Sequence, residues 1–211
     1  MRGALSPLRV GVLVSGAGTN LQALLDAARE PRYPARIVLV GCNRADVAAI
    51  GRAQSAGVPV CLVDRATVPE RVERQRHLLV ALRSADVELV VLAGYDEILV
   101  PEFVAAYSGR ILNTHPSLLP AFGGTMHAVA QALEHGVKVT GCTIHLVTDD
   151  LDNGPILLQE CLEVRDDDDV ASLQARIRER EHRLLPRAVS AFAEGRVRVE
   201  GRRARVIKSD Q

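Results

Sequence analysis

Apolar residues follow two patterns along the chain: short continuous runs, and longer segments with helical spacing. Short runs bounded by polar or glycine-rich segments are typical of strands buried on both faces of a parallel sheet. The longer segments carry apolar residues on one side and charged residues on a solvated outer face. In the first half, the expected strands are 8–14, 36–42, 58–63, 89–93 and 111–112, and the expected helices are 21–28, 46–56, 69–84 and a short helix from Pro101.

The second half of the chain predicts a different connection between strands. Segments 139–147 and 156–164 are β-type runs, and the compact acidic turn between them, 148–155, favours an antiparallel pair. A helix is expected at 126–135. A long helix is expected from about 166 to 194, because its first residues are carboxylates, which favour helix N-termini.

Together these elements predict an α/β protein with a doubly wound, mostly parallel Rossmann-like sheet and an antiparallel C-terminal extension. A terminal hairpin at 197–207 completes the pattern, and the sequence assigns it no role. No internal repeat and no linker divides the chain, so we expect a single domain over residues 1–211. Ligands of such sheets bind beyond the carboxyl ends of the strands.

Composition narrows the class of protein. The 26 basic and 26 acidic residues balance, so no net field favours nucleic acid or an anionic membrane. The four cysteines lie in separate apolar runs without a C-x-x-C pair, which favours a reducing compartment. No apolar run is long enough to cross a bilayer, and the run at 10–14 is too short for a signal peptide. We therefore expect a cytoplasmic protein.

The segment between the first strand and the first helix, 15–20, reads Ser-Gly-Ala-Gly-Thr-Asn. A glycine-rich turn in this place points backbone N–H groups at an anion such as a phosphate. The spacing matches neither the dinucleotide-binding G-x-G-x-x-G motif nor a P-loop. A tight turn that simply needs glycine is the structural alternative.

Asn113 and His115 stand at the end of an expected strand. Residues two apart point to the same face of a strand, so an amide and an imidazole share one spot, and Thr114 between them faces away. The amide can bind a carbonyl oxygen, and the imidazole can move a proton near neutral pH. The structural alternative is a capping Asn and a core His. Turn 15–20 and loop 94–99 are expected at the same edge, which favours a functional site.

The acidic turn at 149–152 can bring a carboxylate to this pair. A carboxylate beside an imidazole favours the charged imidazolium, and an Asn beside it can hold the oxyanion of a tetrahedral intermediate. Since no Ser or Cys nucleophile accompanies them, the set suggests transfer to an external nucleophile. A metal site is the weaker alternative, because the other nearby histidines lack ligand spacing with His115: His127, His135 and His145.

Three motifs resemble the glycinamide ribonucleotide formyltransferases, a folate-dependent family. They are the turn at 15–20, Asn-Thr-His-Pro-Ser-Leu-Leu-Pro at 113–120, and Leu-Asp-Asn-Gly-Pro at 151–155. The resemblance covers about 8–207. The Asn-x-His…Asp set is shared with methionyl-tRNA formyltransferase and formyltetrahydrofolate deformylase, whereas the N-terminal turn and the strand at 141–145 point to the glycinamide type.

The resemblance implies direct transfer of a formyl group from 10-formyltetrahydrofolate to the amine of glycinamide ribonucleotide, in de novo purine biosynthesis and without a metal. It implies a phosphate-binding half at about 8–110 and a folate-binding, catalytic half at about 111–211. The partners are small molecules, and family analogy allows a homodimer. Three alternatives stay open: a deformylase that uses water, a formyltransferase with another amine as acceptor, and a nucleotide-binding regulatory module.

The resemblance also implies roles for single residues. Catalysis falls to Asn113, His115 and Asp152. Substrate binding falls to Gly18, Thr19, Asn20 and Glu181, with His145 near the substrate. Folate or anion contacts fall to Arg71, Asp96, Glu97, Ile98, Leu99 and Asn113. The chain departs from the family pattern in two places. Asp96-Glu97 replaces the family's frequent Met-Arg or Met-Lys, which removes an anion contact to the folate tail. Phe-Gly-Gly at 122–124 replaces the more usual Phe-Pro-Gly.

Overall fold

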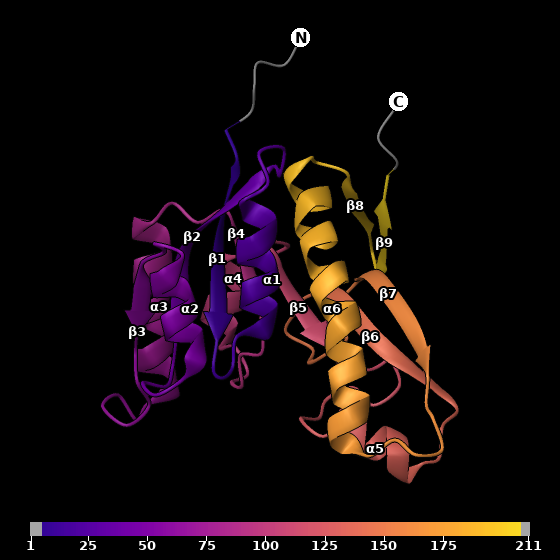
Figure 1. The fold of residues 1–211 in the computed structure, drawn as a ribbon. Coiled ribbons are helices and arrows are strands. Elements are labelled where there is room, and N and C mark those ends of the chain that lie inside the picture. Colours follow the sequence, from indigo (N-terminus) through magenta and orange to yellow (C-terminus); the bar gives the residue numbers. More distant parts are fainter. Residues whose placement is uncertain (1–5, 208–211) are drawn as a thin grey trace.

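The computed structural model describes residues 6–207, and its first half alternates strands with helices as the apolar pattern predicts (Figure 1). The strands are β1 (Leu8–Val14), β2 (Ala35–Cys42), β3 (Val60–Leu62), β4 (Leu89–Leu92) and β5 (Ile111–His115). The helices are α1 (Thr19–Ala28), α2 (Ala48–Ser55), α3 (Arg71–Ser84) and α4 (Pro101–Ala106). The predicted domain limits, residues 1 and 211, lie outside the described residues.

The second half contains α5 (Ala128–Glu134), β6 (Val139–Leu146), β7 (Ile156–Glu163), α6 (Val170–Ala193), β8 (Val197–Glu200) and β9 (Arg203–Val206). A capping box starts α6: the Asp169 carboxylate accepts from the Ser172 N–H at 2.7 Å, and the Ser172 hydroxyl accepts from the Asp169 N–H at 3.0 Å. The helix then runs through Pro186 as a single element.

Across residues 6–207 the strands form one sheet in the order β3-β2-β1-β4-β5-β6-β7-β9-β8. Neighbours from β3 to β5 are parallel, and β6 joins β5 antiparallel and carries β7 antiparallel in turn. This arrangement confirms the predicted fold class. The strand order reverses between β1 and β4, where a doubly wound sheet opens a crevice for ligands. Here the Ser15 N–H donates to the Gly94 carbonyl at 3.0 Å, so the turn after β1 and the loop after β4 meet.

Helices cover both faces of the sheet (Figure 1). Residues of α1, α2 and α6 share a core with Leu112 and Ile144, and residues of α3 and α4 share a second core with Ile111. Strand alternation therefore places Asn113 and His115 on the α3/α4 face and Thr114 on the α1/α6 face. Side chains on the two faces of β5 therefore have different neighbours: those on one face lie toward α3 and α4, and those on the other lie toward α1 and α6.

Candidate active site

Pairing between β5 and β6 builds a polar centre on the α3/α4 face. Asn113 lies opposite His145 in the register, and His115 is two residues further along β5. Asn113 Nδ2 lies 3.1 Å from His145 Nε2. Asp152 contacts both histidines: its Oδ2 lies 3.4 Å from His115 Nδ1, and its Oδ1 lies 3.6 Å from His145 Nε2. The structure thus brings together Asn113, His115 and Asp152, with His145 as the residue that connects them.

Asp152 reaches His115 by a route that simple strand geometry does not supply. β6 runs antiparallel to β5 and ends at Leu146, beside Leu112 and away from His115. The acidic turn therefore folds back over the face of the sheet. Asp152 adopts a left-handed backbone conformation there, with φ at +51°, and its Oδ2 accepts from the Gly124 N–H at 2.8 Å. The loop after β5 and the acidic turn consequently hold each other in place.

Hydrogen-bonding groups surround both histidine rings. His145 Nδ1 lies 3.0 Å from the Leu146 carbonyl and must donate, and its Nε2 faces both the Asn113 amide at 3.1 Å and Oδ1 of Asp152 at 3.6 Å. That amide keeps a second N–H free for a ligand. His115 Nε2 lies 2.8 Å from the Phe122 carbonyl, and its Nδ1 faces Asp152. Because acceptors stand at both nitrogens, the doubly protonated imidazolium satisfies this pocket best.

Asp152 is the anion of the centre, and its side chain is only 9% exposed. Burial alone would raise the pKa of the Asp152 carboxyl. The neighbouring His145, the positive charge of His115 and the Gly124 N–H outweigh burial, and the pKa lies below its ordinary value. Asp152 is therefore ionised at neutral pH and presents a negative charge to Nδ1 of His115.

A cavity of about 310 Å³ opens on the other side of β5, at the point where the strand order reverses. The turn at 16–20, the segment 93–95, the end of β5 and one face of α6 line it. Glu181 is 5% exposed and accepts from the Asn20 side-chain amide at 2.9 Å. The sequence-predicted substrate residues Gly18, Thr19, Asn20 and Glu181 therefore lie in one cavity, and Asn113 joins its wall from β5.

Several cavity residues were not singled out from the sequence. Thr114 lies on the opposite face of β5 from Asn113 and His115, as predicted, and on that face it lines the cavity. Its hydroxyl is buried without a hydrogen-bond partner in the described part of the chain. Gln174 and Arg178 also line the cavity from α6. Their spacing from Glu181, seven and three residues, places all three on one helix face and was a usable signal.

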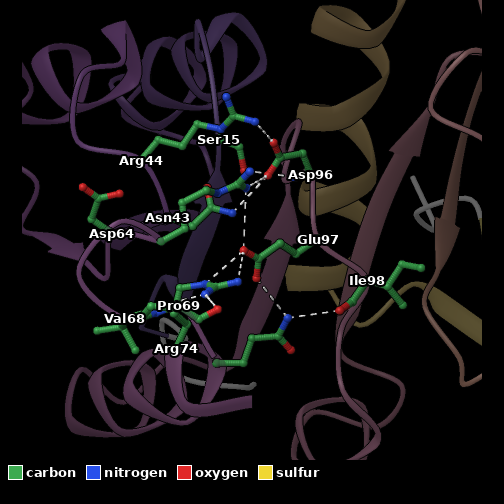
Figure 2. A network of polar contacts seen from close by, with 12 residues as sticks. Ser15, Asn43, Arg44, Asp64, Val68, Pro69, Arg74, Asp96, Glu97 and Ile98 are labelled. Atoms are coloured by element: carbon green, nitrogen blue, oxygen red, sulfur yellow. Dashed lines mark hydrogen bonds and ion pairs between the residues drawn. The ribbon is translucent and has the colours of Figure 1, made fainter. Parts of the chain in front are cut away.

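The loop predicted to contact folate lies beside this cavity, and only Gly94 and Tyr95 of it line the wall. Asp96 and Glu97 direct their carboxylates toward residues after β2 and in α3 (Figure 2). Ile98 is 56% exposed and Leu99 is buried. Arg71 is exposed at the start of α3 and is not among the residues that line the cavity, so its anion contact stays a prediction.

The lowered pKa of Asp96 predicts how the stability of the fold depends on pH. Burial opposes ionisation, but hydrogen bonds from Asn43, Ser15 and Arg44 and the charge of Arg65 lower the pKa of Asp96 from 3.8 to about 2. A lowered carboxyl pKa stabilises the fold above the unfolded-state value, and the contribution is lost as the pH falls through the folded-state value. The stability gap between wild type and Asp96→Asn, measured by urea unfolding, should be full at pH 5 to 7 and shrink between about pH 4 and about pH 2. A gap that does not change with pH would contradict this linkage.

The sheet, the glycine-rich turn and the Asn–His–Asp centre define an α/β protein that has an acid–base centre beside a ligand cavity. The Formyl transferase family profile matches residues 8–189 of the chain. The chain is 48% identical to phosphoribosylglycinamide formyltransferase of Mycobacterium tuberculosis over 203 residues, which are 94% of this chain and 91% of that protein. It therefore belongs to the formyl transferase family and is an enzyme of this family.

Two further comparisons extend the likeness. The crystal structure of glycinamide ribonucleotide transformylase 1 from Symbiobacterium toebii matches with a TM-score of 0.93 and 48% identity, and covers 98% of this chain and 96% of that chain. The human trifunctional purine biosynthetic protein adenosine-3 is 44% identical over 191 residues, 90% of this chain, but the chain spans only 19% of its length. Within residues 6–207, no helix has the length and apolar character needed to cross a membrane.

Proposed function

We propose that the protein transfers the formyl group of 10-formyltetrahydrofolate to the amine of glycinamide ribonucleotide, a step of de novo purine biosynthesis. One observation carries the proposal: Asn113 lines the cavity that contains the glycine-rich turn and Glu181, and it also contacts His145 of the catalytic centre. A substrate with a phosphate and an amine can therefore lie on the α1/α6 face while its amine reaches a formyl donor on the α3/α4 face.

The cavity fits a phosphorylated amine. Gly18 precedes α1 with φ at +69°, and no side chain among residues 6–207 caps this helix, so its first N–H groups are available to a phosphate. The buried Glu181 carboxylate suits a substrate amine or amide N–H. The Oδ1 of Asn20 and the hydroxyl of Thr114 are buried without hydrogen-bond partners in residues 6–207, and a polar ligand would supply them.

In the proposed reaction the amine nitrogen attacks the formyl carbon directly. The second N–H of Asn113 and the Nε2–H of His115 stabilise the oxyanion, after His115 exchanges the Phe122 carbonyl for this new acceptor. Asp152 keeps His115 charged and oriented. The bond between the formyl carbon and N10 of the folate then breaks, and a water relays the proton from the amine to N10. The products are the formylated amine and tetrahydrofolate.

The proposal extends to the organisation of the chain. Residues of about 8–110 form the phosphate-binding half of one domain, and residues of about 111–211 form the folate-binding and catalytic half. The proposed folate and anion contacts of Arg71 and residues 96–99 belong to the same hypothesis. A homodimer is allowed by family analogy.

The test is incubation of the purified protein with 10-formyltetrahydrofolate and glycinamide ribonucleotide, followed by folate absorbance and by detection of the formylated product. We expect consumption of formyl folate that depends on the ribonucleotide. Consumption without any amine would indicate a deformylase, and dependence on a different amine would indicate another formyltransferase. Binding of a dinucleotide with no formyl transfer would support the regulatory module and defeat the proposal.

Glu181→Gln should raise the KM for glycinamide ribonucleotide by about tenfold to a hundredfold and leave the KM for the folate unchanged. A hydrogen bond to a charged group contributes about 1.5–3 kcal/mol, and this substitution removes the charge from a buried bond to the substrate. Steady-state kinetics with each substrate varied in turn measures the effect. Glu179→Gln is the matched control, because Glu179 lies on the same helix with its side chain 66% exposed. Equal KM values in the wild type and Glu181→Gln would contradict the assignment.

A further inference from the structure

The loop after β4 carries two adjacent carboxylates that arginines from three separate segments hold, and Figure 2 shows two of these arginines, Arg44 and Arg74. The Asp96 carboxylate accepts hydrogen bonds from Arg44 and from Arg65, the latter at 2.5 Å, and Asn43 Nδ2 donates to it at 3.0 Å. Glu97 pairs with Arg74 of α3 at 2.8 Å. The loop is therefore tied to the end of β2, to the segment after β3 and to α3 at once.

The pair between Glu97 and Arg74 is the buried part of this network. Each side chain is only 7% exposed. Arg74 donates further to the carbonyls of Val68 and Pro69, both at 2.5 Å, and Tyr95 donates its hydroxyl to Glu97 at 3.1 Å. A buried ion pair adds little net stability compared with apolar residues, but a loop built around it is held in the conformation that keeps both charges paired.

Neutral side chains hold the main chain of the same loop. The Gln75 amide donates to the Ile98 carbonyl at 3.1 Å and accepts from the Val100 N–H at 2.8 Å. At the other end the Asp96 N–H donates to the Ser15 hydroxyl at 3.0 Å. Because Ser15 begins the glycine-rich turn, the loop is fixed directly to the proposed phosphate site.

The network leaves a defined part of the loop free. The carboxylates of Asp96 and Glu97 are engaged by the protein, whereas the N–H groups of Ile98 and Leu99 have no hydrogen-bond partner in the described part of the chain. The Ile98 side chain is 56% exposed. The loop therefore offers main-chain donors and one apolar side chain to a ligand, and it offers no side-chain charge.

We propose that Asp96 and Glu97 are positioning residues for the formyl-folate co-substrate. Through Arg44, Arg65 and Arg74 they hold the 94–99 loop in the conformation that presents its free N–H groups to the ligand. This inference rests on the proposed function. If the loop always has the binding conformation, the apparent affinity for the ligand equals the intrinsic affinity. If it has that conformation one tenth of the time, the apparent affinity is about tenfold weaker.

The kinetic test uses Glu97→Gln in the full chain. We expect the KM for 10-formyltetrahydrofolate to rise about tenfold, with kcat and the KM for the ribonucleotide within about twofold of wild type. Glu102→Gln is the matched control, because Glu102 of α4 pairs at 3.0 Å with Arg76 of α3, the helix that carries Arg74, and both side chains are more than half exposed. A parallel change in kcat and both KM values would indicate general damage and overturn the inference, as would an unchanged folate KM.

Amide hydrogen exchange without ligand tests the same inference independently of activity. The Asp96 and Val100 amides, which bond to Ser15 and Gln75, should exchange faster in Glu97→Gln and at the wild-type rate in Glu102→Gln. Unchanged exchange defeats the positioning role even if the enzyme is active, whereas an inactive wild type defeats only the proposed function. If Glu97→Gln does not fold, Asp96→Asn, at the more exposed end of the network, should show the same pattern with a rise of about threefold.

Discussion

Asp152→Asn is expected to lower kcat by on the order of a hundredfold or more, with both KM values largely unchanged. The substitution keeps the shape of the side chain and removes its charge. The Nδ1 of His115, 3.4 Å from Oδ2 of Asp152, then loses the anion that favours the imidazolium. Because that imidazolium is proposed to stabilise the oxyanion, the loss appears in the transition state and not in substrate binding. Steady-state kinetics with saturating folate measures it.

Asp149→Asn supplies the control for this experiment. Asp149 lies in the same acidic turn, and it is exposed. Its substitution changes the charge of the turn by the same amount without touching either histidine, so we expect nearly wild-type turnover. An equal fall in both variants would assign the effect to the turn as a whole, and unchanged turnover in Asp152→Asn would remove Asp152 from the mechanism.

The fold could be predicted because its determinants are local. Short apolar runs, short connections and right-handed crossovers leave few arrangements for a β-α-β chain, and the observed strand order is one of them. Element ends were less accurate. The helix expected from residue 46 begins at Ala48, because Val47 is still extended with φ at −127° and ψ at 144°. β3 is limited to Val60–Leu62.

The parts of the site that lie within one strand or one turn could be predicted, because the spacing of residues in the sequence determines how they are placed. Asn113 and His115 share a face because they are two residues apart in a strand, and the glycine-rich turn follows β1 as expected. The cavity around Thr114 depends on where α6 packs, and strand alternation says nothing about that. Most charged residues of the helix expected at 69–84 were predicted to lie on a solvated face, but Arg74 is 6% exposed because Glu97, 23 residues later, folds onto it. Such long-range pairs leave no periodic signal in the sequence.

Gly154→Ala is expected to destabilise the fold by about 3 kcal/mol or more, which urea unfolding would measure. A Cβ at this position would lie 1.8 Å from the Leu146 carbonyl oxygen and 2.9 Å from its carbon. Both atoms belong to the backbone of the last residue of β6, so relief requires that the acidic turn move off the sheet. Asp152, two residues earlier, would move with it, and kcat should fall together with stability.

Gly51→Ala tests whether this effect comes from the close contact rather than from the loss of a glycine. Gly51 lies inside α2, and a Cβ there would have no atom of the described residues within 4 Å. Alanine has the higher helix propensity and restricts the unfolded chain, so this variant should gain up to about 1 kcal/mol. The two substitutions add the same methyl group and should change stability in opposite directions. A Gly154→Ala protein that unfolds at the wild-type urea concentration would show that the turn can shift freely, and the account of how Asp152 is held against His115 would then be wrong.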